Sequence, residues 1–410
     1  MSSTTSTATS NITPLSGSQA TQRLLPFALL VFLGYLSVGM PLAVLPGYIH
    51  ETLDFGPTVV GWVIATQSIG TLLTRQFAGL ITDTRGAKNA VIVGTVGCAL
   101  AGLGYGISGI INAMHIWSLV ALLAGRAMLG LGESLLITGA LSWCIGTVGP
   151  RHTGRAMVWV GIAMFGAIGA GAPIGAAIMN KYGFMAVAAT ASVLPLFALT
   201  VGLRKASIAP NGGRRLAFHK VVGLIWRHGM ALALSTVGFG TLFAFLGLDY
   251  AAQGWSGAPY GLTAFGIAYV AARLFFGGLP DQLGGQKVAM VTIPIQGQGL
   301  IALWLAPNPV AALAGSALLG AGYSLTFPAL GVDAVRYVPP QNRGAAMGAY
   351  VAFVDIGLGI TGPIAGTVAS HFNYPATFFV AAIATIVAIF AAVQAHRKDG
   401  TRAIGTDSFS

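Results

Sequence analysis

Residues 75–86, RQFAGLITDTRG, have a near copy at residues 273–284, RLFFGGLPDQLG. Arg, Gly, Asp and Gly recur at the same four positions, 198 residues further along the chain. Further matches are 190 residues apart: GLGESL at 130–135 with GAGYSL at 320–325, and Pro173 with Pro363. These matches predict that the chain consists of two homologous halves with one architecture.

The amino-acid composition is that of a membrane protein. Of the 410 residues, 55% are hydrophobic and 8% are charged, whereas about 25% of residues in an ordinary soluble domain are charged. A membrane-spanning helix needs ~20 apolar residues, so twelve spans would use about 240 residues. This composition excludes a soluble enzyme, a disordered chain and a nucleic-acid-binding protein. Cys98 and Cys144 lie in apolar runs, so we expect two buried side chains rather than a disulfide or a metal site.

The apolar stretches predict an all-α membrane protein with 12 transmembrane helices in two pseudo-symmetric six-helix bundles. The candidate spans are 24–49, 57–82, 88–111, 114–147, 154–180, 184–203, 221–249, 257–282, 286–306, 309–337, 343–370 and 373–396. The expected regions are a disordered N-terminal tail at 1–23, an N-terminal half at 24–203, a basic linker at 204–220, a C-terminal half at 221–396 and a C-terminal tail at 397–410. The Ser- and Thr-rich start of the chain lacks the apolar core of a signal peptide.

The positions of the positive charges predict the orientation in the membrane. Of the 21 Lys and Arg residues, Arg126 lies deep inside a span and Lys181 lies in the connection between the fifth and sixth spans. The others lie in the tails or near connections 2–3, 4–5, 6–7, 8–9 and 10–11. The opposite connections carry His50, Glu51, Asp54, His115, Asp249 and His371 instead. Because positively charged loops stay on the cytoplasmic side, we expect both termini there.

Three motifs resemble those of the major facilitator superfamily of transporters. They are Gly79-x-x-x-Asp83-x-Arg85-Gly86-x-Lys88 after span 2, Arg126-x-x-x-Gly130-x-Gly132 in span 4, and Gly169-Ala-Gly-Ala-Pro173-Ile-Gly175 in span 5. The third is similar to a glycine–proline motif associated with antiporters. Residues 39–48 and 327–333 further resemble a subgroup of arabinose-efflux-like and drug-efflux-like transporters of the bacterial inner membrane. The resemblance covers roughly residues 24–396 and implies two bundles around a cavity that opens alternately to either side.

Charged residues at the cytoplasmic ends of the spans suggest a gate. Asp83, together with Arg85 and Lys88, is expected to meet the N-terminus of the span that starts near Arg343. Asp281 would similarly face the start of span 5 near Arg155. The alternative is that these charges only end spans and set the topology. Arg75 and Arg273 either join the gate or extend to the membrane interface.

Three ionisable residues, Arg126, Glu133 and Asp355, lie inside predicted spans. Each costs about 2.5–3.5 kcal/mol or more in hydrocarbon, which makes it a functional candidate. Glu133 follows Arg126 by about two helical turns, and the resemblance implies that span 4 lines the cavity. We expect Glu133 to carry a proton, because a carboxyl in a partly dry cavity binds protons more readily than one in water. The alternative for Glu133 and Arg126 is a permanent salt bridge with a neighbouring helix.

Other polar and small residues within the spans leave alternatives open. Asp355 shares a helix face with small residues, so it is a titrating site, a lock between the halves, or a carboxyl bound to a facing Thr, Tyr or Arg. Tyr35, Gln67, Gln296 and Tyr323 either contact a ligand or bind one another; Tyr323, at the repeat position of Glu133, is the strongest ligand candidate. Gly169, Pro173 and Gly175 allow close helix packing or form an antiporter-specific seal.

Motifs for other chemistry are missing from the sequence. It contains no Walker A loop, no H-E-x-x-H and no paired cysteines, so we expect no enzyme, no cofactor and no bound metal. The sequence therefore predicts a monomeric secondary transporter whose partners are a small organic solute, protons and the lipid bilayer, with no nucleic acid. Proton-coupled efflux by antiport is the favoured function, and proton symport of a nutrient is the alternative. The duplicated gate motifs argue against a channel or a sensor.

Overall fold

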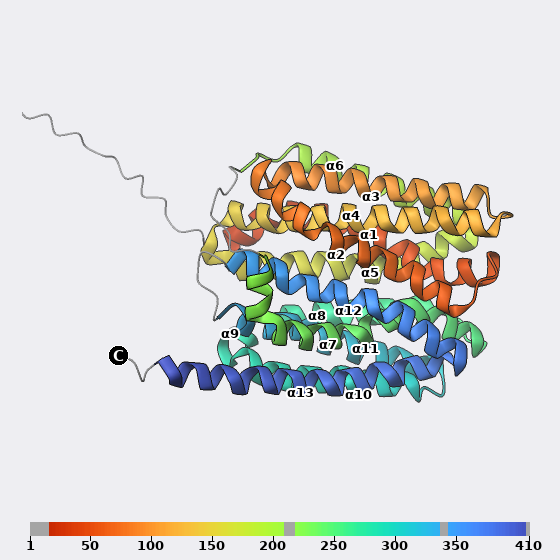
Figure 1. Ribbon diagram of the computed structural model, residues 1–410. Helices are drawn as coiled ribbons and strands as arrows, with labels where there is room; N and C mark the ends of the chain where they lie inside the picture. Colours follow the sequence, from red (N-terminus) through yellow and green to blue (C-terminus); the bar gives the residue numbers. More distant parts are fainter. Residues whose placement is uncertain (1–15, 209–217, 337–342, 407–410) are drawn as a thin grey trace, which may run out of the picture.

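The computed structural model describes residues 16–208, 218–336 and 343–406. Within these residues, long helices lie side by side, and α1 begins at the same end of the bundle where α13 ends (Figure 1). We call this end the basal end and the opposite end the distal end. The N-terminal half contains α1 (Gly17–Gly47), α2 (Pro57–Thr84), α3 (Ala87–Ile110), α4 (His115–Val148), α5 (Thr153–Tyr182) and α6 (Phe184–Leu203). The C-terminal half contains α7 (Phe218–Ala252), α8 (Ala258–Phe276), α9 (Leu279–Leu283), α10 (Gly285–Trp304), α11 (Pro309–Arg336), α12 (Arg343–His371) and α13 (Tyr374–Thr406).

The predicted all-α membrane architecture is confirmed. Ten helices of the described chain are long and apolar enough to cross a membrane. The remaining two long helices, α2 and α10, are more polar because they carry side chains such as Gln67, Arg75 and Gln296. Both pack within the bundle, so they complete the set of twelve predicted spans.

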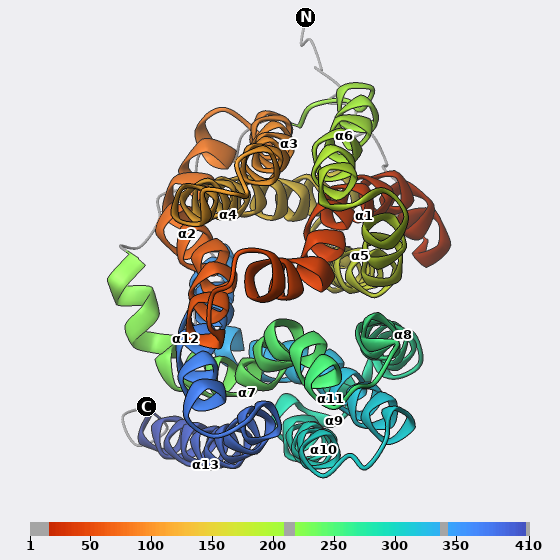
Figure 2. The same cartoon turned by 90° about the vertical axis from the view of Figure 1, so that its right-hand side faces the viewer.

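Helix packing repeats between the two halves, which form separate groups when viewed along the bundle (Figure 2). In the first half α1 packs on α5 and α6, α3 packs on α4 and α6, and α2 packs on α4. In the second half α7 packs on α12 and α13, α10 packs on α11 and α13, and α8 packs on α11. The halves meet mainly where α2 lies on α12 and where α5 lies on α8. In the repeat, α2 corresponds to α8 and α12 corresponds to α5. The two contacts are therefore equivalent, as expected for halves related by a pseudo-twofold axis.

Several helix boundaries differ from the sequence prediction. Helix α13 continues to Thr406, so residues 397–406 of the expected C-terminal tail are helical. Helix α1 begins at Gly17 rather than residue 24, because Ser16 caps it. The Ser16 side chain accepts a hydrogen bond from the Gln19 backbone N–H, and Gln19 Oε1 accepts one from the Ser16 backbone N–H. Residues 17–23 of the expected disordered tail are therefore helical, and residues 1–15 lie outside the described chain, as do residues 209–217 of the expected linker. The expected span 257–282 is broken after Phe276, where Gly277, Gly278 and Pro280 interrupt the helix.

The two halves touch at the distal end and border a cavity at the basal end. At the distal end, Gly61 of α2 and Gly362 of α12 approach so closely that a Cβ on either would overlap the backbone of the other. The Thr58 and Ser370 hydroxyls, 2.9 Å apart, join the same two helices. At the basal end, a cavity of about 1010 Å³ lies between α5 and the helices α8, α9 and α11. In the described part of the chain, the halves are therefore in backbone contact distally and share a cavity basally.

Candidate functional site

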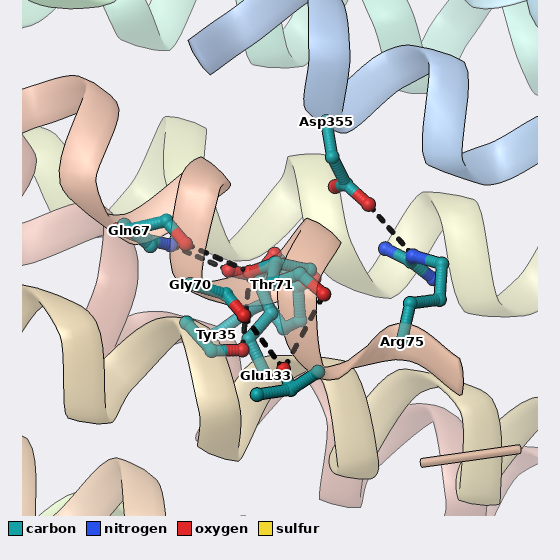
Figure 3. A network of polar contacts seen from close by, with 9 residues as sticks. Tyr35, Gln67, Gly70, Thr71, Arg75, Glu133 and Asp355 are labelled. Carbon is teal, nitrogen blue, oxygen red and sulfur yellow. Dashed lines mark hydrogen bonds and ion pairs between the residues drawn. The ribbon is translucent and has the colours of Figure 1, made fainter. Parts of the chain in front are cut away.

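Glu133 of α4 is bound by two uncharged side chains from neighbouring helices (Figure 3). The hydroxyl of Tyr35 on α1 donates to its Oε1 at 2.6 Å, and Nε2 of Gln67 on α2 donates to its Oε2 at 2.5 Å. Tyr35 is buried and Glu133 is half-buried. Within the described residues no cation bonds to Glu133 directly. Both hydrogen-bond donors to the Glu133 carboxylate are therefore uncharged side chains.

A close approach of α2 and α4 positions this carboxyl. Gly130, one turn before Glu133, lies so near the Gln67 carbonyl that a Cβ at Gly130 would overlap it. The Thr71 hydroxyl donates to the carbonyls of Gln67 and Gly130, at 3.0 Å each, and thereby ties the two helices together. The close approach of the helices therefore explains the glycine of the span 4 motif. Gly130 allows α2 to lie near enough to α4 for the Gln67 side chain to reach Glu133.

Arg75 and Asp355 form an ion pair between the two halves (Figure 3). Arg75 Nε on α2 donates to Asp355 Oδ2 on α12 at 2.6 Å, and the two side chains are 11% and 8% exposed. Arg75 therefore does not extend to the membrane interface. Asp355 lies at the seam between the halves, with an arginine as its partner. Glu133 also interacts electrostatically with Arg75, so the guanidinium is influenced by one carboxylate from each half.

Arg126 lies inside the N-terminal half. Its side chain is 1% exposed. Its Nε donates to the Val63 carbonyl at 3.3 Å and its Nη2 donates to the Ile64 carbonyl at 3.0 Å, whereas Nη1 has no acceptor among the described atoms. No hydrogen bond joins Arg126 to Glu133 in the described chain; both side chains bind α2 instead, one turn apart.

The corresponding position in the C-terminal half is aromatic. Tyr323, the repeat counterpart of Glu133, is buried, and its hydroxyl lies 3.2 Å from that of Thr236 on α7. Its ring packs in a cluster with Phe165, Phe239, Phe265 and Tyr269. Gln296 binds Ser235 and Thr326 at 2.9 and 2.7 Å, so its amide is satisfied by protein groups. At these equivalent positions the N-terminal half therefore has an acidic residue with polar partners, and the C-terminal half has a cluster of aromatic side chains.

The expected gate residues lie at the basal end. Asp281 and Arg155 both line the cavity, but no described hydrogen bond or ion pair joins them, and the Arg155 guanidinium lies beside Gly17 at the start of α1. Lys88 donates to the carbonyls of Leu203 and Lys205 at 2.9 and 2.7 Å, which caps the end of α6. Arg85 is exposed. The side chain of Arg343, the expected partner of Asp83, lies outside the described part of the chain.

The glycines of α5 lie at two helix interfaces. Gly169 faces Gly266 of α8 across the boundary between the halves, and Gly175 lies against the Met40 backbone of α1. A Cβ at Gly175 would overlap Met40. Close packing is therefore one consequence of this motif, with Pro173 inside the helix between the two contacts.

The structure buries two charged residues whose burial the sequence did not predict. Asp249 was assigned to a distal loop, but α7 continues to Ala252 and Asp249 is 3% exposed. Arg273, expected in a gate or at the membrane interface, is 4% exposed and lines the basal cavity, and its Nη2 donates to the Tyr269 hydroxyl at 2.5 Å. The repeat relation between Arg75 and Arg273 was the signal that the two arginines occupy equivalent depths.

Comparisons with known proteins agree on one family. A family model described as Major Facilitator Superfamily matches residues 27–250 and 229–407. An "Uncharacterized MFS-type transporter" of Pseudomonas aeruginosa (strain LESB58) is 43% identical over 378 residues, which cover 92% of this chain and 94% of the relative. YhhS of Escherichia coli (strain K12), also described as an uncharacterized MFS-type transporter, is 40% identical over 375 residues, with 92% and 93% covered.

A solved structure has the same fold. The human organic anion transporter MFSD10 (TETRAN) superimposes with a TM-score of 0.70 at 14% sequence identity, over 91% of this chain and 99% of that one. The family model spans most of the chain, and the bacterial relatives are similar over almost their whole length. The chain is therefore a multi-pass membrane transporter that belongs to the Major Facilitator Superfamily.

Proposed function

We propose that this transporter exports a small organic solute from a bacterial cell in exchange for protons, and that Glu133 is the proton carrier. The observation that carries this proposal is the position of Glu133, which is bound by two neutral donors beside an ion pair that joins the halves. A negatively charged Glu133 attracts Arg75 toward the N-terminal half, in competition with Asp355. A protonated Glu133 leaves Arg75 to Asp355. Proton binding is thereby coupled to the contact between the halves.

The remaining polar residues fit supporting roles in this proposal. Arg126, bound to two backbone carbonyls, is a fixed positive charge within the N-terminal half. Asp83 and Asp281 would close the basal end when the halves rock, and Asp281 and Arg155 already face the same cavity. The basic residues around the basal end support a cytoplasmic location for that end in the bacterial inner membrane. The likeness of residues 169–175 to an antiporter motif supports export over import.

The experiment compares Glu133→Gln with Glu51→Gln, a matched change of an exposed acid at the distal end. Both variants and the unmodified protein are reconstituted in vesicles of known orientation, with a substrate selected by thermal shift from a panel of solutes. We expect Glu133→Gln to lose accumulation driven by a pH gradient and to keep solute exchange in the absence of a gradient. Glu51→Gln should retain both activities, because its side chain is solvated.

The direction of the proton flux relative to the solute flux distinguishes antiport, the proposed mode of export, from symport, the mode expected for import. In antiport, addition of the solute drives protons to the compartment from which the solute leaves, whereas symport moves both in the same direction. A pH-sensitive dye inside the vesicles measures this flux. Gradient-driven accumulation by Glu133→Gln at the unmodified rate would exclude Glu133 as the proton carrier, and proton flux parallel to the solute would exclude antiport.

A further inference from the structure

Arg273 is a buried guanidinium that has no acidic partner among the described residues. It is 4% exposed, and among the described residues no carboxylate lies within 4.0 Å of its nitrogens. Its Nη2 binds the Tyr269 hydroxyl, and the guanidinium lies 5.2 Å from the centre of the Tyr269 ring. Its Nε has no acceptor in the part of the chain that the structure describes. A buried cation is costly unless an anion or several acceptors compensate it, so this arrangement is incomplete as described.

The repeat shows which group is missing. Arg273 corresponds to Arg75, whose partner Asp355 lies on α12. The residue 190 positions before Asp355 is Phe165 on α5, the helix that packs against α8. Phe165 does occupy the equivalent place, because its ring centre is 4.0 Å from that of Tyr269, the hydroxyl partner of Arg273. The C-terminal half thus supplies a carboxylate to Arg75, whereas the N-terminal half supplies an aromatic ring at the equivalent place beside Arg273.

The basal cavity brings Arg273 within reach of a solute. Arg273 lines this space of about 1010 Å³ together with apolar side chains that include Trp159, Phe327, Met157 and Met347. The volume is sufficient for a small organic molecule. Its walls combine the buried Arg273 with aromatic and flexible apolar surfaces, while Arg151, Arg155 and Asp281, which also line the cavity, are exposed. A buried positive charge beside apolar walls suits a ligand that has one anionic group and an apolar body.

We propose that Arg273 binds the anionic group of the transported solute, and that the solute is an organic anion with an apolar or aromatic body. The anionic group of the ligand would take the place of a carboxylate like that of Asp355, because the equivalent position beside Arg273 is Phe165. This inference rests on the proposed function, since it names the class of solute that the transporter would move. It assigns Arg273 to solute binding and leaves proton coupling to Glu133.

The test measures equilibrium binding of 2-naphthoate and of its uncharged analogue 2-naphthamide to the purified full-length protein. Thermal shift and quenching of tryptophan fluorescence report binding without a pH gradient. We expect 2-naphthoate to bind and 2-naphthamide to bind at least about tenfold more weakly, the loss typical of a hydrogen bond to a charged group. Arg273→Gln should weaken 2-naphthoate by a similar factor, and Arg273→Lys should restore part of the affinity. Arg23→Gln, which removes an exposed arginine outside the cavity, should change neither.

A second variant keeps the proposal testable if Arg273→Gln does not fold. Phe165→Asp supplies the missing internal carboxylate, so it should abolish 2-naphthoate binding while Arg273 is present, whereas Phe165→Leu should retain it. Equal affinities for 2-naphthoate and 2-naphthamide, undiminished 2-naphthoate binding by Arg273→Gln, or no 2-naphthoate binding by the unmodified protein would each overturn the proposal. Any of these results leaves proton coupling by Glu133 intact, because no gradient enters the measurement.

Discussion

At the scale of single residues, the contact between Arg75 and Asp355 joins groups that are 280 positions apart in the chain. No local sequence pattern around Arg75 or Asp355 indicates that the two residues form a pair. The pair lies beside Glu133, so the three residues connect α4 to the seam between the halves. The proposed proton carrier therefore acts next to the groups that hold the halves together.

The ion pair leads to a prediction about stability. Arg75→Gln or Asp355→Asn alone leaves one buried charge without its partner, and we expect each to destabilise the described conformation by about 3–5 kcal/mol. The double variant Arg75→Gln/Asp355→Asn removes both charges, so its loss should be smaller than the sum of the single losses. Thermal unfolding of the four proteins in one detergent measures this. Additive losses would show that the two groups do not interact.

At the scale of elements, glycines determine how closely the helices of the two halves approach. Gly61 and Gly362 bring α2 and α12 into backbone contact distally, and Gly169 and Gly266 do the same for α5 and α8. Both contacts cross the boundary between the halves. Sequence reasoning identified glycine stripes on α5 and α12 as packing surfaces, but it did not reveal which helices lie against them.

Adding a methyl group at the distal contact should force the halves apart there. Gly362→Ala would overlap the Gly61 backbone, and we expect a loss of about 1–3 kcal/mol in the stability of the closed distal end. The readout is a Val60→Cys reporter, buried at this contact, and its labelling by an impermeant maleimide added outside intact cells. Labelling should rise several-fold.

The matched control is Gly348→Ala on the same helix, where a Cβ meets nothing within 4 Å. It should leave the labelling of the reporter unchanged. Native cysteines contribute little background, since Cys98 and Cys144 are both buried. If Gly362→Ala and Gly348→Ala give the same labelling, the glycine contact does not close the distal end.

At the scale of the whole molecule, the halves touch distally and enclose a cavity basally. Two packed bundles with a pseudo-twofold relation exchange this arrangement for its opposite by rocking about the central site. Helices α1 and α7, the most deeply buried of the candidate spans, occupy the centre of this arrangement. Apolar side chains such as Phe275 and Phe390 remain exposed on the outside, where lipid would cover them.

Rocking predicts that the two ends respond to each other. Arg155→Cys and Asp281→Cys place thiols on opposite sides of the basal cavity, where the two residues are not joined in the described conformation. Oxidation should link these thiols only when the basal end closes. We then expect the Val60→Cys reporter to become more accessible from outside the cell and to return to its original rate after reduction. A link that forms without any change at the reporter would show that the ends move independently.

The helices, the repeat and the family could be predicted from the sequence alone, because apolar spans and duplicated motifs are local patterns that can be recognised without knowing which residues are in contact. It also singled out Arg126, Glu133 and Asp355, since charges inside apolar spans are recognisable by position alone. Their partners became known from the three-dimensional arrangement of the helices: Glu133 binds Tyr35 and Gln67, and Arg126 binds backbone carbonyls. The physical reason is that a side chain's partner depends on the rotation and separation of packed helices. Those quantities are fixed by contacts between distant segments, which no local pattern encodes.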